Sequence, residues 1–274
     1  MVKLTKNKST VDKLTIFSLL LLLLLTFILS VSSLMMLTSC STHEDNSFRV
    51  GLYESGPPLV FMEDRKVMTG FEVELTYAIS EHIDKKLEIT FLSPDETVVA
   101  LENGSVDCVI SSLELIQRQI EHFDSTDSFL TYGVAIVKLT DDTTIKGLHD
   151  LVGKKVGVTA NTDAEKLCED CLKEVFFDLQ KYDLPNQPLQ ELRLKKKDAA
   201  FCYEYLARYY ENNDPSIYEI LPTIYQKKQY CIKLSKSISD SSAKAIDEAL
   251  LSLKQSGALA ELCKKWFGCD FADG

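Results

Sequence analysis

Apolar and polar positions alternate along this chain in two separate blocks of short segments. In the first block, residues 48–53 alternate with the period of a strand, and Phe71, Leu75, Ile79 and Ile83 form one apolar stripe at helical spacing. Three further elements are predicted in this block: a strand over 87–92, a helix over 95–102 and an apolar strand over 106–110. Strands that alternate with helices over short connections predict an open α/β sheet with mostly parallel strands.

The second block repeats this pattern. Its predicted elements are a strand over 155–158, helices over 162–176 and 186–194, a strand over 198–202, a helix over 203–212, strands over 217–221 and 229–234, and two closing amphipathic helices. Two α/β units in one chain predict two lobes, with residues 131–139 and 220–229 as the crossings between them. Between residues 177 and 197 the pattern shows no strand.

The start of the chain combines a basic flank with a long apolar run. Four lysines precede an apolar stretch over residues 16–33, and small residues follow it, which is typical of a secretory signal. Leu37-Thr38-Ser39-Cys40 resembles the lipobox of bacterial lipoproteins, which implies cleavage before Cys40 and fatty acylation, palmitate for example, of its thiol. The alternative is a transmembrane anchor over residues 16–37. Both interpretations put residues 41–274 outside the cell.

Charge and cysteine content narrow the function classes. Residues 1–39 hold four lysines and one acid, so the remainder carries 26 basic and 40 acidic side chains, a net charge of −14. This balance and the lack of a basic patch argue against nucleic acid as a partner. The pair Cys168 and Cys171 has no histidine at ligand spacing, so we expect neither a metal site nor a cofactor. A disulfide between Cys263 and Cys269 stays open.

Several short motifs occur in a characteristic order. They are Phe48-Arg49-Val50-Gly51, Pro57-Pro58, Thr69-Gly70-Phe71-Glu72-Val73-Glu74-Leu75, Leu101-x-Asn-Gly-x-Val-Asp107 with Ile110-Ser111-Ser112-Leu113, Leu148-x-Asp-Leu-x-Gly153-Lys-Lys-Val-Gly157-Val, Asp198-Ala-Ala, and Gly257-x-Leu-x-x-Leu-x-Lys264-Lys-Trp266-Phe267-Gly268. In this order and spacing the chain resembles the bacterial extracellular solute-binding proteins of family 3, the polar amino-acid type.

The resemblance implies a two-lobed type II periplasmic-binding-protein fold, in which two open sheets joined by two hinge crossings close on a solute. The implied segments are a signal peptide (1–39), a tether (40–47), lobe 1 (48–134 plus 225–268), lobe 2 (135–224) and a C-terminal tail (269–274). The implied partners are a small solute, an amino acid or related amine, and the permease subunits of an ABC importer. A monomer tethered by its lipid to the outer face of the cell membrane is expected.

Solutes of open α/β sheets bind beyond the carboxyl ends of strands. Three strand ends therefore supply the predicted contacts. These contacts are Tyr53 and Glu54; Ser111, Ser112, Leu113 and Glu114; and Thr159, Asn161 and Thr162. The last end opens a predicted helix, whose N-terminus attracts anions. Asn161 or Thr162 also caps that helix.

Charged contacts follow from the resemblance with some departures. The family has an arginine after the Ser111–Ser112 strand that grips a solute carboxylate. Arg118 is the candidate for this role, although a gapless match puts Gln119 at that position and a plain surface arginine is the alternative. Where the family has acids, this chain has Tyr53 and Tyr203, so either Glu54, Glu114 or Glu204 replaces the missing acid or the solute is not an ordinary α-amino acid. Tyr53, Tyr203 and Phe129 could stack on a flat or cationic solute, and core packing is the alternative for each tyrosine.

Two alternatives to transport stay open at this point. A sensor with a redesigned cleft would need a partner chain to pass on its signal. A dehydratase-like enzyme on the same scaffold would need an acid–base pair, which Glu114 and Glu204 could supply. We expect a binding protein and no catalytic residues, because each of these acids is better explained as a binding group.

Overall fold

The computed structural model describes residues 47–64, 66–112 and 114–272, with the backbone alone at residues 114 and 115. A nine-stranded sheet runs in the order β4-β1-β5-β11-β6-β9-β7-β8, and β10 pairs with β6. The strands of this sheet are β1 (Ser47–Leu52), β4 (Lys86–Phe91), β5 (Cys108–Val109), β6 (Ser125–Leu139), β7 (Lys155–Thr159), β8 (Asp178–Tyr182), β9 (Ala199–Tyr203), β10 (Tyr218–Ile220) and β11 (Tyr225–Leu234). A separate hairpin pairs β2 (Phe61–Glu63) with β3 (Val67–Thr69).

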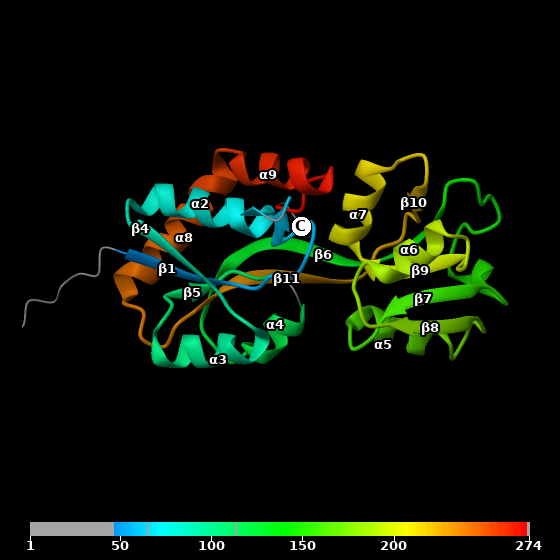
Figure 1. Ribbon diagram of the computed structural model, residues 1–274, viewed down its shortest axis with the longest axis horizontal. Helices are drawn as coiled ribbons and strands as arrows, with labels where there is room; N and C mark the ends of the chain where they lie inside the picture. Colours follow the sequence, from blue (N-terminus) through cyan, green and yellow to red (C-terminus); the bar gives the residue numbers. More distant parts are fainter. Residues whose placement is uncertain (1–46, 65, 113, 273–274) are drawn as a thin grey trace, which may run out of the picture. The chain divides into compact units, whose positions relative to one another are not determined.

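The sheet contains two parallel portions. Strands β4, β1 and β5 are parallel to one another, and so are β9, β7 and β8. Between them lie β6 and β11, which pair antiparallel with each other and with their outer neighbours. Figure 1 shows these two long strands side by side as they run from one portion to the other. The predicted α/β architecture with two crossing strands is therefore present.

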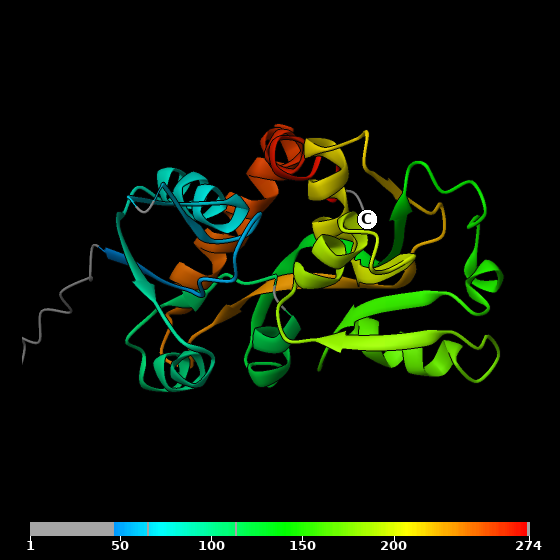
Figure 2. The same cartoon turned by 45° about the vertical axis from the view of Figure 1, so that its right-hand side comes forward.

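Helices cover both faces of each portion. They are α2 (Phe71–Ile83), α3 (Pro94–Asn103), α4 (Glu114–Gln119), α5 (Asp163–Cys171), α6 (Gln187–Arg193), α7 (Glu204–Asn213), α8 (Asp240–Gln255) and α9 (Ala258–Phe267), with one 3₁₀ turn at Leu148–Leu151. Figures 1 and 2 show α2, α8 and α9 on one face of the β4-β1-β5 portion and α3 and α4 on the other. Around the second portion, α6 and α7 lie on one face and α5 on the other.

Local sequence explains where the first helices begin. Gly70 precedes α2 with a φ of 126°, and a Cβ there would lie 2.1 Å from the Leu59 carbonyl oxygen, so only glycine fits. In α3, Ser93 accepts a hydrogen bond from the Glu96 N–H while the Glu96 side chain accepts from Ser93, a capping box. These signals agree with the predicted helices.

The structure corrects several predicted elements. The helix predicted over 162–176 ends at Cys171, because the chain turns there and returns as β8, which pairs parallel with β7. The strand predicted over 106–110 is only Cys108–Val109, and the crossing predicted at 131 begins at Ser125. Strand β8 itself lies in the stretch where the sequence showed none.

The predicted signal segment and Cys40 lie outside the described residues, as does the tether apart from its last residue, Ser47, which begins β1. Within the described part of the chain, each helix is too short or too polar to cross a bilayer.

Candidate functional site

A hollow of about 410 Å³ opens between α4 and the start of α5. Its lining residues are Arg118, Gln119, Asn161, Thr162, Glu165 and Lys166. Arg118 is exposed, and its Nη2 donates a hydrogen bond of 2.8 Å to the Asn161 carbonyl oxygen. The structure therefore brings together three predicted contacts, Arg118, Asn161 and Thr162. Gln119 lines the same hollow, and its Oε1 is buried with no hydrogen-bond partner among the described residues.

The end of β7 shapes one wall of this hollow. Asn161 adopts a left-handed φ of 60°, which turns the chain into α5. Thr162 caps the helix and accepts a 3.2 Å hydrogen bond from Glu165 N–H, while the Glu165 carboxylate accepts from Asn161 N–H at 2.5 Å. The hydrogen bond from Lys181 lowers the pKa of Glu165. A capped helix N-terminus next to Arg118 is an arrangement that suits an anionic group.

The end of β5 differs in burial, and its polar groups also bond within the protein. Ser111 and Ser112 are buried, at 1% and 0% exposure. The Ser112 N–H and hydroxyl both donate to Oε1 of Glu72, and the Tyr132 hydroxyl donates to the Ser112 carbonyl oxygen. The Ser111 carbonyl accepts from Gln117 Nε2 at 2.5 Å. Direct contact of these two serines with a solute stays a prediction.

Glu72 is fully buried beneath this strand end. Burial raises the pKa of Glu72 to about 7, although the hydrogen bonds from Ser112 act to lower this pKa. Its second oxygen, Oε2, has no hydrogen-bond partner within the described residues. The sequence placed Glu72 in a family motif without a role, and its partner Ser112 is forty residues away.

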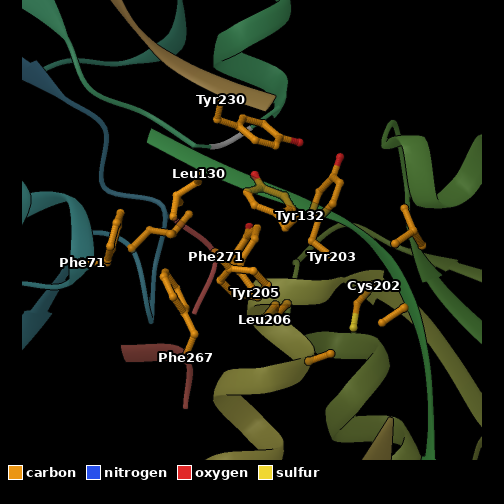
Figure 3. Close-up of a cluster of buried hydrophobic side chains, with 14 of the residues drawn as sticks. Phe71, Leu130, Tyr132, Cys202, Tyr203, Tyr205, Leu206, Tyr230, Phe267 and Phe271 are labelled. Carbon is orange, nitrogen blue, oxygen red and sulfur yellow. The ribbon is translucent and has the colours of Figure 1, made fainter. Parts of the chain in front are cut away.

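Tyrosines from both crossing strands and the second portion gather around Tyr132 (Figure 3), whose hydroxyl donates to the Ser112 carbonyl oxygen. Tyr132 of β6 stacks on Tyr230 of β11 with ring centres 4.1 Å apart, and the edges of Tyr205 and Tyr203 meet it at 4.8 Å and 6.0 Å. Burial raises the pKa of Tyr132 well above its usual value. Tyr203 is 8% exposed, and with Thr159 and Thr162 it also lines a small cavity of about 30 Å³.

The remaining predicted contacts that the structure describes are not among the residues that line the larger hollow. Tyr53 is partly buried against the side chains around α3 and α4, and Glu54 is exposed. Glu204 is buried and ion-paired with Arg208 at 3.6 Å. The Leu113 position and the Glu114 side chain lie outside the described residues. Ligand contact by these five residues stays a prediction.

Sequence reasoning missed Asp163 as well as Glu72. Asp163 directly follows the cap residue Thr162, is 6% exposed and accepts hydrogen bonds from Lys166 at 2.9 Å and from Lys228 of β11. An acid in the first turn of a helix at a predicted strand end was a signal that could have found it. Lys228 could not be found in this way, because it reaches the site from a strand 65 residues later.

The described cysteines form no disulfide, and the described residues form no metal site. Each of the seven described cysteines is a free thiol, so the disulfide left open between Cys263 and Cys269 is not formed. In the part of the chain that the structure describes, no cluster of His, Cys, Asp and Glu could hold a metal ion.

Comparison with known proteins now identifies the class. Residues 48–269 match the model of the bacterial extracellular solute-binding proteins, family 3. The chain belongs to this family. Among curated relatives, the L-cystine-binding protein TcyJ of Escherichia coli (strain K12) is 27% identical over 228 residues, 83% of this chain and 85% of that protein. The arginine-binding extracellular protein ArtP of Bacillus subtilis (strain 168) is 25% identical, covering 84% of this chain and 92% of that protein.

Solved structures of this family share its fold. An ancestral arginine-binding protein bound to arginine superposes with a TM-score of 0.61 at 28% identity, covering 82% of this chain and all of that one. The L-cystine solute receptor of Neisseria gonorrhoeae, in its unliganded open conformation, gives a TM-score of 0.68 at 22% identity over 82% of this chain and 94% of its own. The type II binding-protein fold predicted from the sequence is confirmed, and these relatives are named as binding proteins.

Proposed function

We propose that this family member is an extracellular, lipid-anchored protein that binds a polar amino acid or a similar small nitrogenous solute and delivers it to an ABC importer. The observation that carries this proposal is the hollow between Arg118 and the capped start of α5, at the carboxyl end of β7. Its volume of about 410 Å³ is in the range of small-molecule sites.

The carboxylate of the solute has two complementary partners in this proposal. The Arg118 guanidinium can bind it through two parallel hydrogen bonds, and the positive end of α5 lies across the hollow at Asn161 and Thr162. The solute ammonium needs an acid, since a buried unpaired ammonium is costly. Glu54, Glu114 and Glu204 remain the predicted acids.

The remaining parts of the proposal concern attachment and closure. Cleavage before Cys40 and acylation of its thiol would tether the protein to the outer face of the membrane, as a monomer that docks on permease subunits. Lobe 1 comprises residues 48–134 and 225–268, and lobe 2 residues 135–224, so both boundaries fall within or beside β6 and β11. We propose a binding role without catalysis, in line with the named relatives.

Solute binding is tested by thermal shift and calorimetry with a panel of amino acids that includes L-cystine and L-arginine, the solutes named for the relatives. We expect at least one to raise the melting temperature of the purified protein. Arg118→Met should weaken its binding about tenfold or more, since hydrogen bonds to charged groups are worth about 1.5–3 kcal/mol. The matched control is Arg193→Met, because Arg193 is an exposed arginine paired with Asp214 away from the hollow. Absence of binding across the panel would refute the proposal.

Attachment is tested separately in a lipoprotein-processing bacterial host. The wild-type protein should partition into the detergent phase with a diacylated Cys40 at its N-terminus by mass spectrometry, and Cys40→Ser should abolish this modification. A wild-type chain that retains residues 1–39 would support the membrane-spanning alternative instead.

A further inference from the structure

Glu72 is a buried acid that the proposed solute contacts do not use. It is the second residue of α2 and is 0% exposed. Desolvating a carboxyl group costs free energy, and an apolar side chain of similar size would fill this space without that cost. The hydrogen bonds that Glu72 makes therefore indicate its role.

Both of its observed hydrogen bonds go to one residue, Ser112. The Ser112 N–H and hydroxyl donate to the same carboxylate oxygen, while the Tyr132 hydroxyl fixes the Ser112 carbonyl from the other side. Ser112 is thus held between α2 and the crossing strand β6. Its main chain has little freedom to shift as long as Glu72 supplies an acceptor.

Helix α4 begins two residues after Ser112. It has only six residues, Glu114–Gln119, and a helix this short is not stable by itself in water. Its described contacts include the Gln117 amide, which donates to the Ser111 carbonyl at 2.5 Å and to the Cys231 carbonyl at 3.1 Å, and the fully buried Ile116, which packs in an apolar cluster with α3. Arg118 is the next residue after Gln117, so these contacts, together with Ser112 two residues before the helix, hold the main chain from which Arg118 reaches the Asn161 carbonyl.

We propose that Glu72 is a positioning residue for solute binding: by holding Ser112 it fixes the start of α4, and α4 holds Arg118 across the hollow from Asn161. The inference rests on the proposed function, because it assigns Arg118 to the solute carboxylate. Glu72 touches no solute in this account and acts only through Ser112 and α4. A purely structural role would instead lower stability without any specific link to Arg118.

A double-mutant cycle separates these two roles. The variants are Glu72→Leu, which removes the acceptor, Glu72→Gln, which keeps one, Arg118→Met, and the pair Glu72→Leu with Arg118→Met. The matched control is Glu74→Gln, which alters an acid on the same helix whose partner is Lys265. Affinities are measured by calorimetry for L-cystine and L-arginine and for cystamine and agmatine, which lack the carboxylates.

We expect Glu72→Leu to weaken binding of the carboxylate-bearing probe about tenfold or more, Glu72→Gln to restore most of the loss, and Glu74→Gln to change nothing. In the Arg118→Met background, Glu72→Leu should cause no further loss, and the probes without carboxylates should respond little. Equal losses in both backgrounds, or for both kinds of probe, would overturn the inference. Ser112→Ala, which removes the hydroxyl donor alone, replaces Glu72→Leu in the cycle if that variant does not fold.

Hydrogen exchange in the solute-free protein gives a readout that does not depend on any solute. Peptides that cover α4 should lose protection in Glu72→Leu, or in Ser112→Ala, while Arg118→Met and Glu74→Gln keep it. Unchanged exchange in α4 would refute the positioning role even if an amino acid binds. Lost protection in a protein that binds no amino acid would instead refute the proposed function and leave the anchoring role standing.

Discussion

The ends of β5 and β7 lie on opposite sides of the proposed solute site and differ in burial. At the β5 end, Ser111 and Ser112 are buried and make hydrogen bonds with Glu72, Tyr132 and Gln117. At the β7 end, Asn161 is exposed in a left-handed conformation and Thr162 caps a helix. Polar groups at both ends make internal hydrogen bonds, but those of the first end are buried, whereas Asn161 and Thr162 of the second also line the hollow.

This difference shows that a short polar sequence at a strand end can either be buried in internal contacts or line a binding site. Two serines after a buried strand are predicted to contact a ligand. Buried polar groups need hydrogen-bond partners, however, and here other residues of the protein supply them. The exposed end needs fewer internal partners, because water or a solute can reach it. We therefore expect mutations at the β5 end to affect stability and, through α4, binding as well, and those at the β7 end to affect mainly binding.

Tyr132→Ala should have the largest effect. Tyr132 is fully buried between Tyr230, Tyr205 and the β5 end, so its removal should lower the free energy of unfolding by about 3–5 kcal/mol. Urea unfolding measures this loss. Tyr77→Ala, at a tyrosine that is 54% exposed on α2, is the matched control and should cost less than about 1 kcal/mol. Similar losses in the two variants would show that the β5 end is not the more buried region.

The pH dependence of Glu72 should give the next largest effect. Its folded pKa of about 7 lies above its ordinary value of 4.5, so between these pH values the folded state keeps a proton that the unfolded state releases. Stability should therefore fall as pH rises from about 4.5 to 7 and then level off, by about 3 kcal/mol in total.

The measurement is urea unfolding of the wild type and of Glu72→Gln at pH 4.5, 6 and 8. Other titrating groups are common to both proteins, so the stability of the wild type relative to Glu72→Gln should decrease across this window. A difference that does not vary with pH would mean that Glu72 is not buried as described.

Thr162→Ala should have a smaller effect on stability. It removes the hydroxyl that accepts from Glu165 N–H, and losing such a cap costs about 1 kcal/mol. Thr162→Ser keeps an acceptor and should retain most of that stability. If Thr162→Ala leaves solute affinity unchanged, the β7 end does not contribute to binding through this residue. The expected difference in binding between the two strand ends would then be absent at Thr162.

Asn161→Gly should have the smallest effect on stability, within about 1 kcal/mol, because glycine adopts a left-handed φ of 60° readily. It removes the side chain without straining the backbone, so a fall in solute affinity measured by calorimetry would assign a contact to the Asn161 amide. Asn161→Ala should be less stable than Asn161→Gly, and the opposite order would contradict the left-handed conformation.

The strongly periodic elements could be predicted from the sequence. Strand β1, helices α2 and α3 and strand β9 follow local patterns and local caps, which one chain displays in full. Strand β8 could not, since three of its five side chains are exposed at the sheet edge and no alternation marks it. The helix α4 is too short for an apolar stripe to form.

The candidate site was predictable to a similar extent. Arg118, Asn161 and Thr162 meet because carboxyl ends of strands gather at one edge, which is a rule of the fold. The burial of Ser112 and the packing of Tyr203 depend on partners far away in the sequence, Glu72 and Tyr132. Such pairs carry no local signal, so the sequence could not reveal them, and contact of Ser112 and Tyr203 with a solute stays a prediction.

The narrow ribbon made by β6 and β11 has a consequence for how affinity can be adjusted. The backbones approach so closely that a Cβ at Gly133 would lie 2.2 Å from the Tyr225 carbonyl oxygen, and the β11 register is irregular at three places. If the lobes close as proposed, this ribbon must bend, and its elastic stiffness subtracts from the free energy gained on capture. Substitutions there would retune uptake across a range of nutrient concentrations while the chemical identity of the cargo stays the same.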